Sequence, residues 1–137
     1  MDRDPAALQR YLDRYPPDIV ILTHYWREIA PHLQARGWIM VHTDDWAFIM
    51  VPQRPDTAEL IQHEAYRWLK SWEKVDVTPA IAAQVLKEAE RAIRHCPQDS
   101  NAAQAFKVNA LQALGRTDEW REAHRQLQAA RASRGYD

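Results

Sequence analysis

The segment from residue 38 to 51 constrains the fold more than any other part of the sequence. It holds two runs of β-favouring residues, WIMVHT and WAFIMV, on either side of the acidic pair Asp44 and Asp45, and Pro52 ends the second run. Two such runs joined by a short turn predict a β-hairpin. Because side chains alternate between the two faces of a strand, both faces of this hairpin are apolar. A bare hairpin is only marginally stable, so we expect helices to cover its faces, or a second copy or a partner to pair with its edge.

Before the hairpin, apolar residues recur at intervals of three and four, which predicts two helices. The first should cover residues 5–15 and stop at a pair of prolines. The second should be longer, with its apolar stripe running from Ile19 to Leu33 and Gly37 in the left-handed position after its end. This second segment has the clearest helical pattern of the first half of the chain.

After the hairpin, the sequence predicts helices only. Asp56 and Glu59 form a capping box for a helix that carries an apolar stripe as far as Trp72. Thr78 and Pro79 suit the N-cap and first position of the next helix. Three helices are therefore expected in the last third of the chain: 78 to about 96, 100–114 and 118–132.

These elements predict a mostly α fold of the α+β class, with one β-hairpin near 38–51 and a repeat-like helical hairpin at the C-terminal end. The length of 137 residues fits one domain. We expect a single domain over 1–137, made of a helix-hairpin-helix part, 1–77, and a helical part, 78–137.

Composition disfavours several classes of protein. Apolar residues make up 46% of the chain and charged residues 27%, and no stretch approaches the roughly 18 uninterrupted apolar residues of a membrane-spanning helix. The first residues are charged and include no apolar segment of the secretory type, so we expect a cytoplasmic protein without a membrane partner. The single cysteine, Cys96, excludes an intramolecular disulfide.

Small residues recur through the last sixty positions where paired helices would approach closely. The pattern includes Val85, Ala89 and Ala92 in one helix and Ala123 and Leu127 in a later one, with a proline between helices at position 97. The stretch 78–132 resembles a degenerate tetratricopeptide-type helical repeat. The resemblance implies a helical surface that grips peptides or partner proteins, without catalytic residues. Residues 1–77 resemble no known family.

One set of residues has a spacing that suits metal binding. His24, Glu28 and His32 are four residues apart, so they share one side of the predicted second helix, and neighbouring pairs could reach one metal ion. A solvated row of polar side chains has the same spacing, and we assign no metal to this candidate. The sequence has no phosphate-binding glycine loop and no nucleophile motif, so no cofactor is predicted. A small metal-binding or hydrolytic enzyme is the alternative function.

The last predicted helix carries a stripe of arginines that could contact nucleic acid. Arg121, Arg125 and Arg131 lie close to one line along this helix. Acidic residues interrupt the stripe, and the net charge of the chain is −1. Arginines near the end of a helix also interact favourably with its dipole. A nucleic-acid-binding accessory protein is therefore only the third hypothesis.

Tryptophan is abundant, with 6 residues in the chain, and it is enriched at the centres of protein interfaces. Trp38 and Trp46 flank the predicted turn of the hairpin, where a small domain has difficulty burying both. The sequence therefore predicts a non-enzymatic protein-protein interaction module, such as an adaptor, a chaperone or a stoichiometric inhibitor. Self-association through the hairpin is one form that this interaction could take. The candidate partner-binding residues are Trp38, Trp46, Phe48, Arg121 and Arg125.

Overall fold

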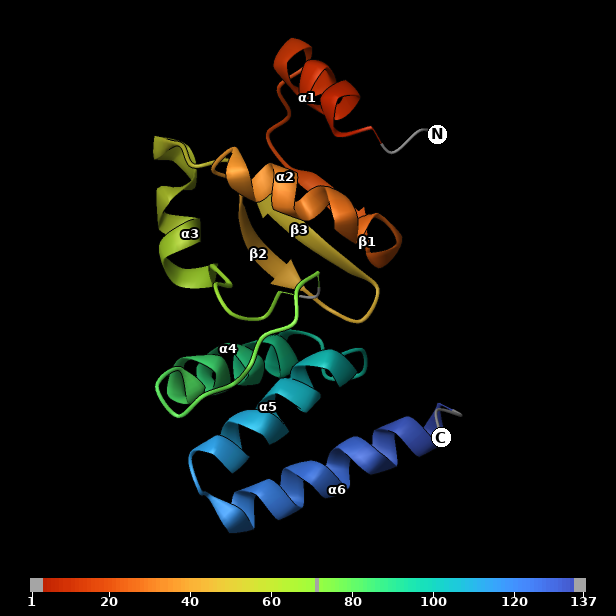
Figure 1. The fold of residues 1–137 in the computed structure, drawn as a ribbon, viewed down its shortest axis with the longest axis vertical. Coiled ribbons are helices and arrows are strands. Elements are labelled where there is room, and N and C mark those ends of the chain that lie inside the picture. Colours follow the sequence, from red (N-terminus) through yellow and green to blue (C-terminus); the bar gives the residue numbers. More distant parts are fainter. Residues whose placement is uncertain (1–3, 71, 135–137) are drawn as a thin grey trace. The chain divides into compact units, whose positions relative to one another are not determined.

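The computed structural model describes residues 4–70 and 72–134 of the chain. The protein is mostly helical and has one small antiparallel sheet, which confirms the predicted α+β class (Figure 1). The chain divides into two compact units. The N-terminal unit comprises Met1–Thr43 and Ala47–Tyr66, and the C-terminal unit comprises Asp44–Trp46 and Arg67–Asp137. The turn of the hairpin therefore groups with the C-terminal unit.

The N-terminal unit is built on a three-stranded antiparallel sheet in the order β1-β3-β2. Strands β2 (Ile39–Thr43) and β3 (Ala47–Val51) form the predicted hairpin, with a bulge in β2 between Met40 and His42. Strand β1 (Val20–Thr23) pairs with the other side of β3. Helix α2 (Ala30–Ala35) crosses the sheet, and α3 (Ala58–Glu64) lies beside β2 (Figure 1).

The core of the N-terminal unit lies on one face of this sheet and beneath α2. Met40, Phe48 and Met50 alternate onto the same face and are fully buried or nearly so, as is Leu33 of α2. Helix α1 (Pro5–Arg14) begins at Asp4, whose Oδ1 accepts the N–H of Ala6 at 2.9 Å. The predicted first helix is thus confirmed, but it buries only one residue, Leu12.

The long helix predicted from Ile19 to Leu33 is wrong. The chain instead forms β1, a 3₁₀ helix η1 (His24–Ile29) and the short α2. The run IVILT at 19–23 is rich in β-branched residues, which lose side-chain freedom in a helix and suit a strand. Pairing with β3 then satisfies its backbone. Gly37 does adopt a left-handed conformation after α2, with φ of 88°, as predicted.

The helix predicted to reach Trp72 is shorter than expected. A 3₁₀ turn, η2 (Pro55–Thr57), leads into α3 (Ala58–Glu64), and Ala65 is already extended. In place of the predicted capping box, Thr57 Oγ1 accepts the N–H of Arg54 at 3.0 Å. The backbone N–H of Tyr66 then donates to the carbonyl of Met40 at 2.8 Å. This hydrogen bond holds the chain at the outer edge of β2, away from the axis of α3.

The C-terminal unit contains three successive helices, α4 (Ala82–His95), α5 (Asn101–Ala113) and α6 (Thr117–Ser133). Short loops join them, and α5 packs against both α4 and α6 (Figure 1). The predicted helices 100–114 and 118–132 are confirmed to within a residue or two. Helix α4 starts later than predicted, because a turn in which Ile81 N–H donates to Thr78 O precedes it. Alanines line the contacts, including Ala89, Ala92 and Ala110, which are fully buried or nearly so.

No helix in the part of the chain that the structure describes is long and apolar enough to cross a membrane.

Candidate interaction surfaces

The outer edge of β1 is the most apolar exposed element of the N-terminal unit. Strand β1 lies at one end of the sheet, and no further strand pairs with its outer edge among residues 4–70 and 72–134. Ile21 in this strand is 64% exposed and Ile19 just before it is 50% exposed. Natural sheets usually protect such edges with charged residues or prolines, but residues 19–23 contain neither. This edge is therefore suited to accept another strand.

Further large apolar side chains are exposed in the same unit. Tyr25 follows β1, is 68% exposed and packs its ring edge-on against Trp26 with centroids 5.3 Å apart. Tyr11 and Tyr15 lie on and just after α1, with ring centroids 5.4 Å apart. The exposed large apolar side chains of this unit, among the residues described, are Tyr11, Tyr15, Ile19, Ile21, Tyr25 and Leu60.

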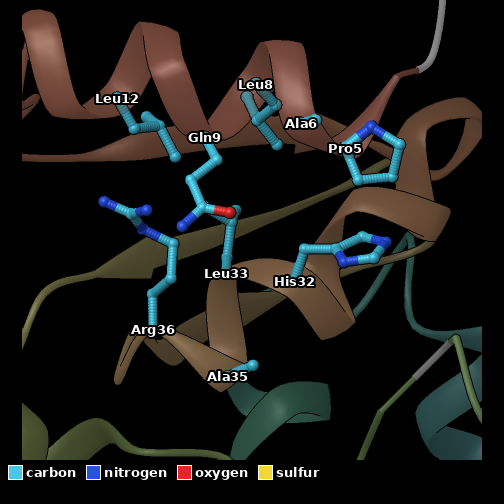
Figure 2. Close-up of a pocket in the computed structure, with 9 residues that line it drawn as sticks. All are labelled: Pro5, Ala6, Leu8, Gln9, Leu12, His32, Leu33, Ala35 and Arg36. Atoms are coloured by element: carbon cyan, nitrogen blue, oxygen red, sulfur yellow. The ribbon is translucent and has the colours of Figure 1, made fainter.

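A cleft of about 360 Å³ lies between α1 and α2. Gln9 and Leu12 of α1 point across this space toward Leu33 of α2 and toward Arg36, which directly follows α2 (Figure 2). Near it, Arg36 donates to Asp13 Oδ1 at 2.6 Å, which links the two helices. The lining residues include no carboxylate: Pro5, Ala6, Leu8, Gln9, Leu12, His32, Leu33, Ala35 and Arg36. The cleft can hold an apolar group by burial, but it does not bring together an acid and a base.

Of the three aromatic residues that the sequence predicts for partner binding, the structure buries two and exposes one. Trp38 is only 7% exposed and Phe48 is fully buried, so in this conformation both belong to the core and neither can contact a partner. Trp46 is 66% exposed, and its backbone N–H donates to Asp44 Oδ1 at 2.7 Å within the turn. Alternation along β3 explains the difference, because Phe48 shares its face with the buried Met50.

The histidine row predicted on one helix is divided between two elements. His24 and Glu28 lie in the 3₁₀ helix η1, and His32 lies in α2. The ring of His24 packs against Phe48 with centroids 5.7 Å apart, whereas His32 lines the cleft beside α1. No three histidine, cysteine, aspartate or glutamate side chains are grouped to hold a metal ion within the described parts of the chain.

The arginines of α6 are paired with acidic neighbours on their own helix. Arg125 donates to both carboxylate oxygens of Glu122, at 3.0 and 2.6 Å, and Arg121 lies 3.6 Å from Asp118. The hydrogen bond from Arg125, followed by one from Gln126, lowers the pKa of Glu122 below its ordinary value. The same pair raises the pKa of Arg125. These pairs offset much of the positive charge that a nucleic-acid interface would use.

Sequence reasoning missed Glu88, which is buried in α4. Its Oε1 accepts the N–H of Arg67 at 2.7 Å, and its Oε2 accepts those of Trp68 and Leu69 at 2.9 and 3.1 Å. Hydrogen bonds to a charged acceptor are stronger than neutral ones, so one side chain fixes the segment that leads into the helical unit. The available signal was a glutamate beside Ala89 on the apolar stripe of a helix.

Sequence reasoning also missed the role of Asp45 in the hairpin turn. Its two carboxylate oxygens accept the N–H groups of Asn101 and Ala102 at 2.9 and 3.1 Å, so it caps the start of α5 from a distant part of the sequence. Arg134 pairs with Asp45 at 3.0 Å and with Asp99 at 2.9 Å. The turn interpretation of the acidic pair is confirmed, but no local pattern could have indicated a cap 56 residues away.

Comparison of the chain with protein-family models, with curated proteins and with solved structures found no match.

Proposed function

We propose that this chain is a cytoplasmic, non-enzymatic protein-protein interaction module that binds through the outer edge of β1. The observation that carries the proposal is an uncharged edge strand with two large aliphatic side chains, Ile19 and Ile21, at least half exposed. A strand added to such an edge gains backbone hydrogen bonds, and the side chains that alternate along it supply specificity.

The energy available at this edge suits a reversible contact. Full burial of an isoleucine side chain contributes about 1.5–3 kcal/mol, so covering the exposed parts of Ile19 and Ile21 contributes about 1 kcal/mol each. The neighbouring Tyr25, which is more exposed than either, adds further apolar area. These contributions have to exceed the cost of association, which favours a binding partner that covers the strand and its flanks together.

The helices of the C-terminal unit are proposed to act as a tetratricopeptide-like scaffold. Support comes from the serial packing of α4, α5 and α6 and from the small residues at their contacts. In repeat proteins such helical hairpins present a surface to peptides or other proteins. In this unit the one large apolar side chain that is exposed, among the residues described, is Trp46. The proposal of an adaptor, chaperone or inhibitor therefore rests mainly on the N-terminal unit.

Capture experiments with matched variants test this function. The tagged full chain and two variants, Ile21→Lys and Leu60→Lys, would be used to retain proteins from lysate of the source organism. Both variants replace an exposed aliphatic residue of the N-terminal unit by lysine, but only Ile21 lies on the sheet edge. We expect the wild type and Leu60→Lys to retain the same stoichiometric protein, either a different protein or a second copy of the chain, and Ile21→Lys to lose it. Equal retention by all three would contradict the proposal.

A further inference from the structure

We propose that the strand which covers β1 is β1 of a second copy, so that two sheets join antiparallel across a two-fold axis at Ile21. This inference rests on the proposed function and names the partner of the same surface. A strand edge that pairs with its own copy in the antiparallel direction is self-complementary, so one surface serves both protomers. The two three-stranded sheets would become one continuous sheet.

The limits of the exposed strand are symmetric about Ile21. A bend at Asp18, directly after Pro17, precedes it, and a proline has no N–H to contribute to a ladder. The 3₁₀ helix η1 begins at His24 and ends the extended segment on the other side. Residues 19–23 are what remains for pairing, and their centre is residue 21. A second copy therefore offers a strand of matching length in the register that buries Ile21 against Ile21.

The side chains at the edge complement each other in this register. Ile19 would lie opposite Thr23 of the second copy, and Ile21 would lie opposite its equivalent. Within the chain Ile21 already lies beside Ile49 of β3, so pairing would extend one apolar row across both sheets.

Charge favours the antiparallel direction over the parallel one. Residues 19–23 carry no charge, and Asp18 just before them is ion-paired with Arg54 at 2.9 Å. The antiparallel register places the two Asp18 side chains at opposite ends of the joined strands. A parallel, in-register pairing would instead place the two Asp18 carboxylates side by side, and like charges directly opposite each other destabilise a strand pair.

The mass of the full chain in solution tests the dimer. Sedimentation velocity over a range from micromolar to millimolar concentration would compare the wild type with Ile21→Lys and Leu60→Lys. We expect the wild type and Leu60→Lys to move from the monomer mass of 16.0 kDa toward twice that value as concentration rises. Ile21→Lys should stay monomeric, because two lysines would meet at the axis.

Disulfide trapping tests the register. In a Cys96→Ser background, a cysteine introduced by Ile21→Cys would face its own equivalent, with Cβ atoms about 4.5–5.5 Å apart, within reach of a disulfide after small adjustment. Thr23→Cys and Leu60→Cys are the controls. We expect rapid oxidative cross-linking only for Ile21→Cys.

Three results would overturn the inference or its register. A wild type that stays monomeric throughout, yet captures another protein in an Ile21-dependent manner, would exclude the second copy and leave the proposed function standing. A monomer that captures nothing through Ile21 would contradict both. Cross-linking of Leu60→Cys at the same rate as Ile21→Cys would mean random collision and would also overturn the register.

Discussion

The two units of this protein differ in how many large apolar side chains they leave exposed to solvent. Among the described residues, the N-terminal unit exposes six large apolar side chains, including two isoleucines at an uncovered sheet edge, whereas the C-terminal unit exposes only Trp46. Ion pairs do not distinguish the units, because both contain them, as in the contacts of Arg36 with Asp13 and of Arg125 with Glu122. The difference lies in the apolar side chains that each unit leaves exposed.

The difference follows from the elements of which each unit is made. A helix satisfies its backbone internally, so stacked helices need only bury one stripe each. A strand depends on its neighbours, and a sheet of three strands always leaves two edges. In the N-terminal unit Tyr66 donates to the outer edge of β2, but the described residues place no strand at the edge of β1. The sheet therefore has one edge without a strand partner among the described residues, whereas the stacked helices have no such edge.

The largest effect is expected for Glu88→Ala in the C-terminal unit. The change leaves three backbone N–H groups without their acceptor, and at about 1 kcal/mol or more for each, the free energy of unfolding should fall by about 3 kcal/mol. Urea unfolding followed by circular dichroism should show a midpoint lower by about 2 M. Glu90→Ala, two residues further along the same helix, is the control and should change little. Equal midpoints for both variants would show that the stability of this unit does not depend on the hydrogen bonds of Glu88.

The next effect is expected for Leu12→Ala, which tests how loosely α1 is attached. Leu12 is the one buried residue of α1, and its truncation should cost about 2 kcal/mol locally. Hydrogen exchange of the α1 amides should then accelerate by about 30-fold, while the strands keep their protection. Tyr11→Ala, at an exposed position of the same helix, should have little effect. If the whole sheet lost protection with α1, the helix would be an integral part of the core instead.

A smaller effect is expected for Asp45→Ala. The start of α5 loses two capping hydrogen bonds, and Arg134 loses one of its partners, so stability should fall by about 1–2 kcal/mol. Exchange of the Asn101 and Ala102 amides should increase most. Asp118→Ala, at an exposed position of α6, should stay within about 0.5 kcal/mol of the wild type. An effect confined to the hairpin turn would contradict the cap.

The smallest effect is expected for Arg125→Gln on α6. Without the guanidinium the pKa of Glu122 should rise toward its ordinary value, which an NMR pH titration of this carboxyl group would record. Because the folded-state pKa is lowered, the pair stabilises above the pKa of the unfolded chain, and this contribution disappears as the pH falls through the folded-state pKa. Arg131→Gln should leave the titration of Glu122 unchanged. A basic surface with unpaired arginines would instead show no shift in either variant.

Much of the fold could be predicted from local patterns. The hairpin, α1, α5 and α6 follow from alternation, from helical spacing and from glycines such as Gly37 and Gly115, both of which adopt positive φ. The segment 19–33 could not be predicted in this way, because Ile19, Leu22 and Trp26 satisfy a helical spacing while the β-branched residues between them favour a strand. Only the presence of β3 as a pairing partner decides between the two.

The candidate surface was predictable in kind but not in position. The sequence indicated an apolar sheet that needs cover, and it placed the exposed aromatic residues at the hairpin. In the structure Trp38 and Phe48 are buried, and the exposed edge belongs to Ile21 in a segment predicted to be helical. The position of an edge depends on which strands find partners, and strand pairing joins residues far apart in the sequence.

The sequence by itself therefore determined the class of fold, most helix positions and the excess of apolar β-favouring residues, because these depend on propensity and on periodicity over a few residues. The tertiary structure decided the contacts that cross the sequence. It made Val20–Thr23 an edge strand, brought Asp45 to the start of α5 and placed Glu88 against the backbone of residues 67–69. The structural role of a strand edge, a distant cap or a buried carboxylate depends on the groups that pack beside it, and those groups come from other parts of the sequence.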